Sequence, residues 1–118
     1  MKIQYEATND TYISLSLDQT IQVWKYSSMS TLRTKVFKEF CSCFDVSSNG
    51  EYIAFGLLNN SIQIASFTDM ENIMFQKQID DKPISIRFEP TMKPLRVLIG
   101  GRRGEITILE IINQKYNH

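Results

Sequence analysis

The sequence predicts an all-β protein in which about three small antiparallel sheets follow one another along the chain. The first observation is a threefold pattern, in which a polar turn leads into alternating apolar residues at 18–26, 59–67 and 103–111. The second is the spacing of that pattern, since Ile21, Ile62 and Ile106 are separated by 41 and 44 residues. The third is an apolar run, Tyr-Ile-Ala-Phe-Gly-Leu-Leu, in the middle of the chain. Regular spacing near forty residues indicates a repeat architecture rather than three chance similarities.

The middle unit shows its strands most clearly. We expect strands at 41–47, 51–58 and 61–67, and a weaker fourth strand at 73–78. Ser-Ser-Asn-Gly at 47–50 is a turn signal between the first two strands. Asn59-Asn60 forms the next turn, because asparagine adopts a positive φ at small cost.

The run at 52–58 indicates a strand that is covered on both faces. A strand with one face in water alternates apolar and polar residues, and this run does not. A small sheet that lies between two neighbouring sheets would account for the pattern.

The fourth segment of each unit is ambiguous from sequence. Apolar residues between 29 and 40 also fit one face of a helix, namely Met29, Leu32, Val36, Phe37 and Phe40. The repeat frame favours a strand near 32–38, and the same choice arises at 70–79.

These motifs resemble the WD-repeat β-propeller family. The middle unit shows the family's pattern of strand, Ser-Ser-Asn-Gly turn, strand, Asn59-Asn60 turn and strand, and Asp18 to Trp24 (Asp-Gln-Thr-Ile-Gln-Val-Trp) is the best copy of its terminal motif. In the third unit, Phe88-Glu89-Pro90 is similar to the family's Phe-Ser-Pro corner, and Arg103-Gly104 occupies the turn. The resemblance covers almost the whole chain and implies a partial β-propeller of about three four-stranded antiparallel blades.

The repeats depart from the family pattern at several positions. Trp24 is followed by lysine, and the other two tryptophan positions carry Ala65 and Leu109. The single histidine, His118, is the last residue, so the Asp, His, Ser/Thr and Trp network that often links these repeats does not form as a full set. At the family's position, Trp24 is expected to pack between blades, with a surface anchor for a partner as the alternative.

We expect three units at approximately 1–40, 41–82 and 83–118, the last without its fourth strand. Closed propellers usually have four to eight blades. Three explanations for the shortfall stay open: a fragment of a larger propeller, assembly with copies or with another chain to close a ring, or a compact three-sheet protein. Each end of the stack would otherwise expose a sheet face and strand edges.

The composition of the chain limits the kinds of partner and cellular location that we expect. The chain has 118 residues, 42% of them hydrophobic, and a formal net charge of zero. Neutrality argues against non-specific attraction to nucleic acid or to an anionic membrane. With no apolar run long enough to span a bilayer and no secretory signal, we expect an intracellular, cytoplasmic protein.

The sequence predicts no enzyme, metal site or cofactor. Cys41 and Cys43 with one terminal histidine lack the ligand spacing of a zinc site, and they fit two small buried residues in a reducing compartment. A cysteine nucleophile would need a positioned base, which His118 does not supply. Asp80, Asp81 and Glu89 are expected to be solvated, and no glycine-rich phosphate loop is present.

Arg102-Arg103 raises one alternative function. A related propeller family that binds phosphoinositides carries a large apolar residue followed by Arg-Arg-Gly, and the pair here matches it at 102–104. Arginines grip phosphate groups through paired hydrogen bonds. Gly101 replaces the large apolar residue, however, and the pair lies in a hairpin turn, so a charged turn is the competing interpretation.

The resemblance implies a non-catalytic scaffold that mediates protein–protein interaction within a larger complex. The alternatives are a phosphoinositide-binding propeller and an accessory segment of a larger enzyme or coat subunit. The candidate contact residues lie in the turns between second and third strands: Asp18, Gln19, Asn59, Asn60, Arg102 and Arg103.

Overall fold

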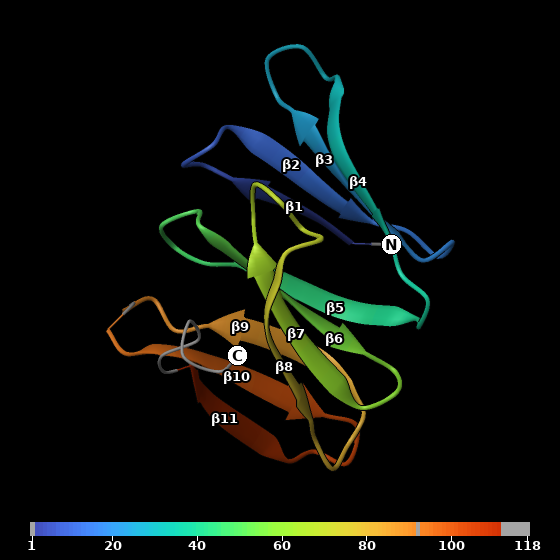
Figure 1. The fold of residues 1–118 in the computed structure, drawn as a ribbon, viewed down its shortest axis with the longest axis vertical. Coiled ribbons are helices and arrows are strands. Elements are labelled where there is room, and N and C mark those ends of the chain that lie inside the picture. The colour runs from blue at the N-terminus through green and yellow to red at the C-terminus, as the bar shows by residue number, and fades with distance from the viewer. Residues whose placement is uncertain (1, 92, 112–118) are drawn as a thin grey trace.

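The computed structural model describes residues 2–91 and 93–111, which form eleven strands (Figure 1). In chain order they are β1 (Lys2–Glu6), β2 (Thr11–Leu15), β3 (Thr20–Lys25), β4 (Thr31–Val36), β5 (Cys41–Val46), β6 (Tyr52–Leu57), β7 (Ser61–Ser66), β8 (Ile73–Gln78), β9 (Pro83–Phe88), β10 (Leu95–Gly101) and β11 (Ile106–Ile111).

The strands build three antiparallel sheets in chain order. The first sheet contains β1 to β4, the second β5 to β8, and the third β9 to β11. The all-β partial propeller is therefore confirmed, and the ambiguous segments are the strands β4 and β8, not helices. The predicted absence of a fourth strand in the last unit concerns residues 112–118, which lie outside the described residues.

Each sheet repeats the register of the one before it. Tyr5 pairs with Tyr12 and Tyr12 with Trp24, as Val46 pairs with Ile53 and Ile53 with Ala65. Phe88, Val97 and Leu109 occupy the same three positions in the third sheet. By sequence alone, the Tyr-Ile pairs at 12–13 and 52–53 would match Tyr12 to Tyr52. The register corrects this by one residue, to Ile53.

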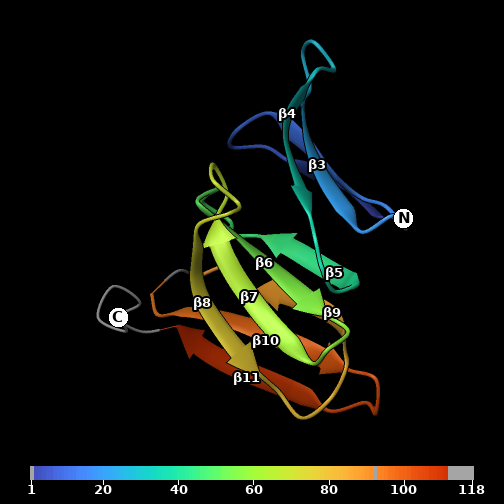
Figure 2. The same cartoon turned by 45° about the vertical axis from the view of Figure 1, so that its right-hand side comes forward.

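The second sheet lies between the other two, as predicted from its apolar run (Figures 1 and 2). Five of the six residues of β6 are buried. Alternate side chains of this sheet enter two separate cores. Phe44, Ile53 and Phe55 pack towards the first sheet, whereas Ala54 and Ile64 pack towards the third.

Polar contacts between sheets supplement the apolar ones. The Lys35 side chain is only 8% exposed, and its ammonium pairs with Glu71 at 3.1 Å and donates to the Met70 carbonyl. Gln4 donates to the Asp45 carboxylate at 3.0 Å, and that carboxylate accepts the Phe88 amide at 2.8 Å. Lys35 and Asp45 are therefore paired or hydrogen-bonded, as the burial of a charged group requires.

Within the described residues, no helix is long and apolar enough to cross a membrane.

Gly56 lies against the side chains of Cys43 and Pro83, and we expect Gly56→Ala to be destabilising. A Cβ there would fall 2.6 Å from Cys43 Sγ and 2.9 Å from Pro83 Cβ. Relieving that overlap would push the second and third sheets apart, at a cost of about 1–3 kcal/mol. The free energy of unfolding, measured by urea denaturation, reports the effect.

Gly100→Ala is the matched control, because Gly100 holds the equivalent position in the third sheet. Its added Cβ would meet only Ser85 Cβ, at an ordinary 3.5 Å. A similar loss of stability in both variants would show that the sheet contact at Gly56 is not the cause.

Candidate interaction face

The six candidate contact residues lie at the same end of the strands, in the turns between the second and third strand of each sheet. In each sheet, the second strand runs towards this end and the third strand runs away from it. The three turns that join these strands therefore gather there (Figure 1). We call this surface the turn face, formed by the turns at 16–20, 57–61 and 101–105 and by the intersheet linkers at 37–40 and 79–82. Asp18, Asn59, Arg102 and Arg103 are exposed, and Gln19 and Asn60 are partly buried.

The three turns have the same backbone structure. The fourth residue of each turn donates its amide to the carbonyl of the first: Gln19 to Ser16, Asn60 to Leu57, and Gly104 to Gly101. These donors have φ values of 70°, 66° and 88°. The positive φ expected in the Asn59-Asn60 turn is therefore confirmed at Asn60, and Gln19 and Gly104 adopt it at the same turn position.

Asp18 and Asn59 stabilise their own turns. The Asp18 carboxylate accepts the Thr20 amide at 3.2 Å and the Ser16 and Thr20 hydroxyls. These bonds hold the pKa of Asp18 below its ordinary value, with the Ser16 hydroxyl as the main cause. Asn59 Oδ1 accepts the Ser61 amide and hydroxyl in the same way.

The linkers tie neighbouring turns together through the backbone. In the first linker, the Phe37 amide donates to Gln19 and the Phe40 carbonyl accepts from Leu58, both at 2.9 Å. In the second linker, the Ile79 amide donates to Asn60 at 2.7 Å and the Lys82 carbonyl accepts from Arg102 at 2.9 Å. The turns of the first and second sheets, and those of the second and third, are thus joined by equivalent bridges.

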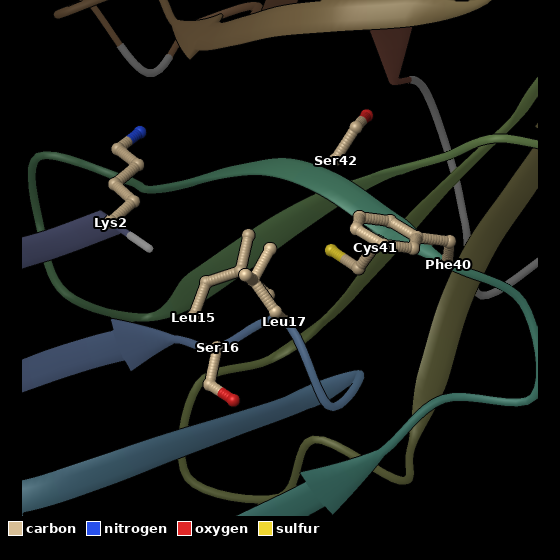
Figure 3. Close-up of a pocket in the computed structure, with 7 residues that line it drawn as sticks. All are labelled: Lys2, Leu15, Ser16, Leu17, Phe40, Cys41 and Ser42. Carbon is tan, nitrogen blue, oxygen red and sulfur yellow. The ribbon is translucent and has the colours of Figure 1, made fainter.

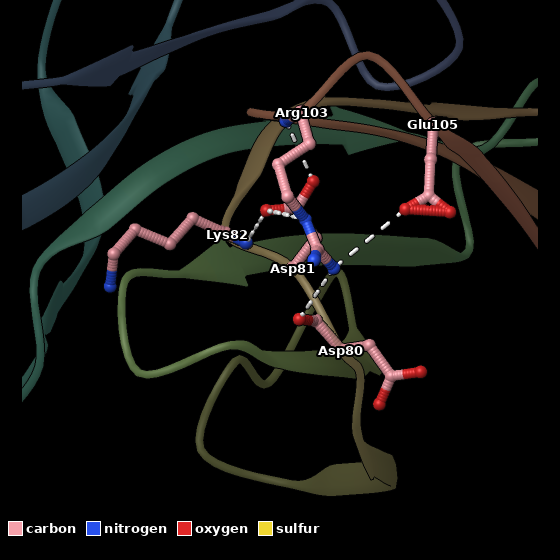
Figure 4. A network of polar contacts seen from close by, with 5 residues as sticks. All are labelled: Asp80, Asp81, Lys82, Arg103 and Glu105. Carbon is pink, nitrogen blue, oxygen red and sulfur yellow. Dashed lines mark hydrogen bonds and ion pairs between the residues drawn. The ribbon is translucent and has the colours of Figure 1, made fainter.

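Arg103 is held in an acidic setting (Figure 4). Its amide donates to Asp81 Oδ2 at 2.8 Å, and its guanidinium lies 3.5 Å from the same carboxylate. The guanidinium also donates to the Asp80 carbonyl at 3.1 Å and lies 3.7 Å from Glu105. The pKa of Asp81 lies below its ordinary value, chiefly because the Arg103 amide donates to it. Arg103 therefore acts as part of a local ion-pair network.

The surroundings of the arginine pair do not form a concentrated positive site. The acidic residues Asp80, Asp81 and Glu105 lie beside Arg103. Together they balance the positive charges of Lys82, Arg102 and Arg103. The local packing also explains why residue 101 is a glycine, since a Cβ there would fall 2.9 Å from Asp81 Cγ. The glycine that departs from the phosphoinositide-binding pattern lets the Asp81 carboxylate approach the turn.

A small pocket between the first and second sheets opens near the turn face (Figure 3), lined by Lys2, Leu15, Ser16, Leu17, Phe40, Cys41 and Ser42. Its two chemically active groups are engaged. Lys2 donates to the Phe44 carbonyl at 2.8 Å and lies 4.6 Å above the Phe44 ring. Burial raises the pKa of the Cys41 thiol to about 12, which leaves very little thiolate at neutral pH.

Cys41 and Cys43 are both free and buried, as the sequence suggested. They line different cores, since Cys41 packs towards the first sheet and Cys43 towards the third. No group of three or more His, Cys, Asp or Glu side chains that could hold a metal ion occurs at 2–91 and 93–111.

Trp24 does not pack between blades in this structure. It lies on the face of the first sheet that points away from the second, partly buried beside Ile3, Tyr12 and Met29. Its indole Nε1–H donates to the Ser14 hydroxyl at 3.0 Å. The expectation of a core position is wrong for the described residues, because no sheet among them covers this face.

Sequence reasoning missed Asp81 and the linkers as parts of the turn face. Asp81 was expected to be a solvated carboxylate, but it is partly buried and holds a turn that lies 22 residues away along the chain. The only local signal was the placement of Asp80-Asp81 between two predicted strands of different sheets.

Comparison with known proteins supports the fold alone. No protein-family model and no curated protein matches the chain. Among solved structures, the β-propeller domain of Myceliophteria thermophila Cps50 (Swd1) matches 94% of the chain with a TM-score of 0.79 and 12% identity. The C-terminal WD40 domain of Sif2 matches 93% with a TM-score of 0.74, also at 12% identity. The chain spans 35% and 33% of those two chains, so it has the fold of about one third of a WD40 propeller structure.

We expect Asp81 to control the conformation of the third turn. A carboxyl with a lowered pKa keeps its bonds above its ordinary value of 3.8 and loses them as the pH falls through the lower, folded-state value. The amide signal of Arg103 in a ¹H–¹⁵N spectrum should therefore shift with a midpoint below 3.8, and Asp81→Ala should abolish that shift.

Asp80→Asn is the matched control, because Asp80 contacts Arg103 through its backbone carbonyl. Its carboxylate points away from the network in Figure 4. An Arg103 amide that titrates in the same way in wild type and Asp81→Ala would contradict the assignment.

Proposed function

We propose that this chain is a non-catalytic scaffold whose turn face binds a protein partner within a larger complex. The observation that carries the proposal is the set of backbone bridges through the two linkers, which hold three separate turns at fixed spacing. A surface that is already ordered loses little conformational entropy when it binds. Loops positioned by a rigid sheet framework are also common binding surfaces.

The chemistry of the turn face suits a protein better than a lipid headgroup. Positive groups (Lys38, Lys82, Arg102, Arg103) alternate with negative ones (Asp18, Glu39, Asp80, Asp81, Glu105). A mixed surface of this kind discriminates between partners by matching charge patterns. Phosphoinositide binding would instead require arginines available to an anionic group, whereas Arg103 is already surrounded by acceptors.

Proximity labelling in cells tests the scaffold. We expect the wild-type chain to label a reproducible set of proteins, and the double variant Asn59→Lys/Arg102→Ala to lose most of that set. The matched control is Thr68→Lys/Lys93→Ala, which makes the same two kinds of change at exposed residues on the opposite end of the strands. If both variants label the wild-type set, the turn face is not the binding surface.

A vesicle experiment addresses the lipid alternative separately. We expect the chain to sediment equally little with phosphatidylcholine vesicles and with the same vesicles containing phosphatidylinositol bisphosphate, because carboxylates neutralise Arg103. Arg102→Ala/Arg103→Ala should then change nothing. Binding that depends on both the phosphoinositide and the two arginines would replace the scaffold as the function of this face.

A further inference from the structure

Two sheet faces at the ends of the stack remain apolar and uncovered by the described residues. The first outer face belongs to the first sheet and contains Ile3, Tyr5, Tyr12, Trp24, Tyr26 and Met29. The last outer face belongs to the third sheet and contains Arg87, Leu98, Ile106 and Ile108, with Leu98 paired to both Arg87 and Ile108. Ile3 is 64% exposed and Ile108 is 58% exposed.

The residues of the first outer face hold the same strand positions as the buried residues of the second sheet that pack on the first sheet. The registers make Ile3, Tyr5 and Tyr12 equivalent to Phe44, Val46 and Ile53. Trp24 likewise corresponds to Ala65. All four residues of the second sheet are buried in the core shared with the first sheet.

The last outer face repeats the other buried face of the second sheet, the one that packs on the third. Leu98 corresponds to Ala54, and Ile106 and Ile108 correspond to Ile62 and Ile64. Their counterparts are at most 1% exposed, in the core shared with the third sheet. The two outer faces are therefore the two halves of a contact that the chain already makes twice.

We propose that the last outer face of one copy of this chain packs on the first outer face of a second copy, and that two copies close a ring of six sheets. The number of copies follows from the number of sheets. The described residues of one copy supply three sheets and those of three copies would supply nine, whereas closed propellers usually have four to eight blades. Two copies, related by a twofold axis with two identical head-to-tail contacts, satisfy that limit.

A polar contact supports the same pairing. Gln4, Asp45 and Arg87 are equivalent positions in the three sheets. Gln4 donates to Asp45 across the first intersheet contact, and Asp45 lies 4.0 Å from Arg87 across the second. In the proposed contact, Arg87 of one copy faces Gln4 of the other, whose side-chain carbonyl accepts a hydrogen bond from a guanidinium. Because the turn face takes no part, this inference stands independently of the proposed function.

Light scattering coupled to size-exclusion chromatography tests the assembly. We expect the 118-residue chain to elute with about twice its mass of 13.7 kDa. Ile3→Glu and Ile108→Glu should each yield a monomer, with dimerisation weakened about 100-fold or more, because each places a carboxylate in both contacts. Both residues are exposed in a single copy, so circular dichroism should show an unchanged fold. Leu17→Glu, an exposed apolar residue on neither face, is the matched control and should remain dimeric.

Mixing the two variants tests the head-to-tail arrangement. A pair of one Ile3→Glu copy and one Ile108→Glu copy retains one contact in which both faces are unaltered, so the 1:1 mixture should recover dimers that neither variant forms alone. A wild-type chain that is monomeric at 100 µM, a dimer that survives Ile108→Glu, a mass well above twice that of the chain, or a mixture that stays monomeric would each overturn the proposal.

Discussion

The burial of both faces of the second sheet is the contact on which the rest of the structure depends. Each large apolar side chain that moves from water into a core contributes roughly 1.5–3 kcal/mol. The second sheet divides its apolar side chains between two cores, with Phe44 and Phe55 in one and Ile62 and Ile64 in the other. Without either neighbour, one of these sets would be exposed. The second sheet is therefore stable only as the middle member of a stack.

Stacking of this kind also determines the geometry of the turn face. The same two kinds of face meet at each intersheet contact. Each sheet copies the register of the previous one, down to an irregularity between the third and fourth strands at Val23/Trp24 and Ile64/Ala65. The chain must then cross from one sheet to the next in a short linker. Those crossings bring the linker backbone into hydrogen-bonding distance of the turns on both sides. The order of the candidate binding surface is thus a consequence of core packing.

Local chemistry explains which parts of the fold and site could be predicted from sequence. Strands and turns depend on neighbouring residues, so the four strands of the middle unit and the positive φ of Asn60 followed from the pattern. The face that a residue occupies is harder to predict, because a slip of one residue moves every side chain to the opposite face. Matching the Tyr-Ile pair at 12–13 to the one at 52–53 makes such a slip, because the register matches Tyr12 to Ile53. The contact between Arg103 and Asp81 could not be predicted from neighbouring residues either, because the linker at 79–82 brings Asp81 to the turn.

The first outer face has a different composition from the buried face of the second sheet to which it corresponds. The first outer face carries Tyr5, Tyr12, Tyr26 and Trp24, where the second sheet has only aliphatic residues and phenylalanine. Tyr5 donates its hydroxyl to Asp10 at 2.8 Å and Trp24 donates its indole N–H to Ser14, so the polar ends of these rings have partners while the ring surfaces stay apolar. Tyrosine and tryptophan are enriched at protein interfaces for this reason. A face that must be exposed in one copy and buried in an assembly would need this combination, whereas a permanent core does not.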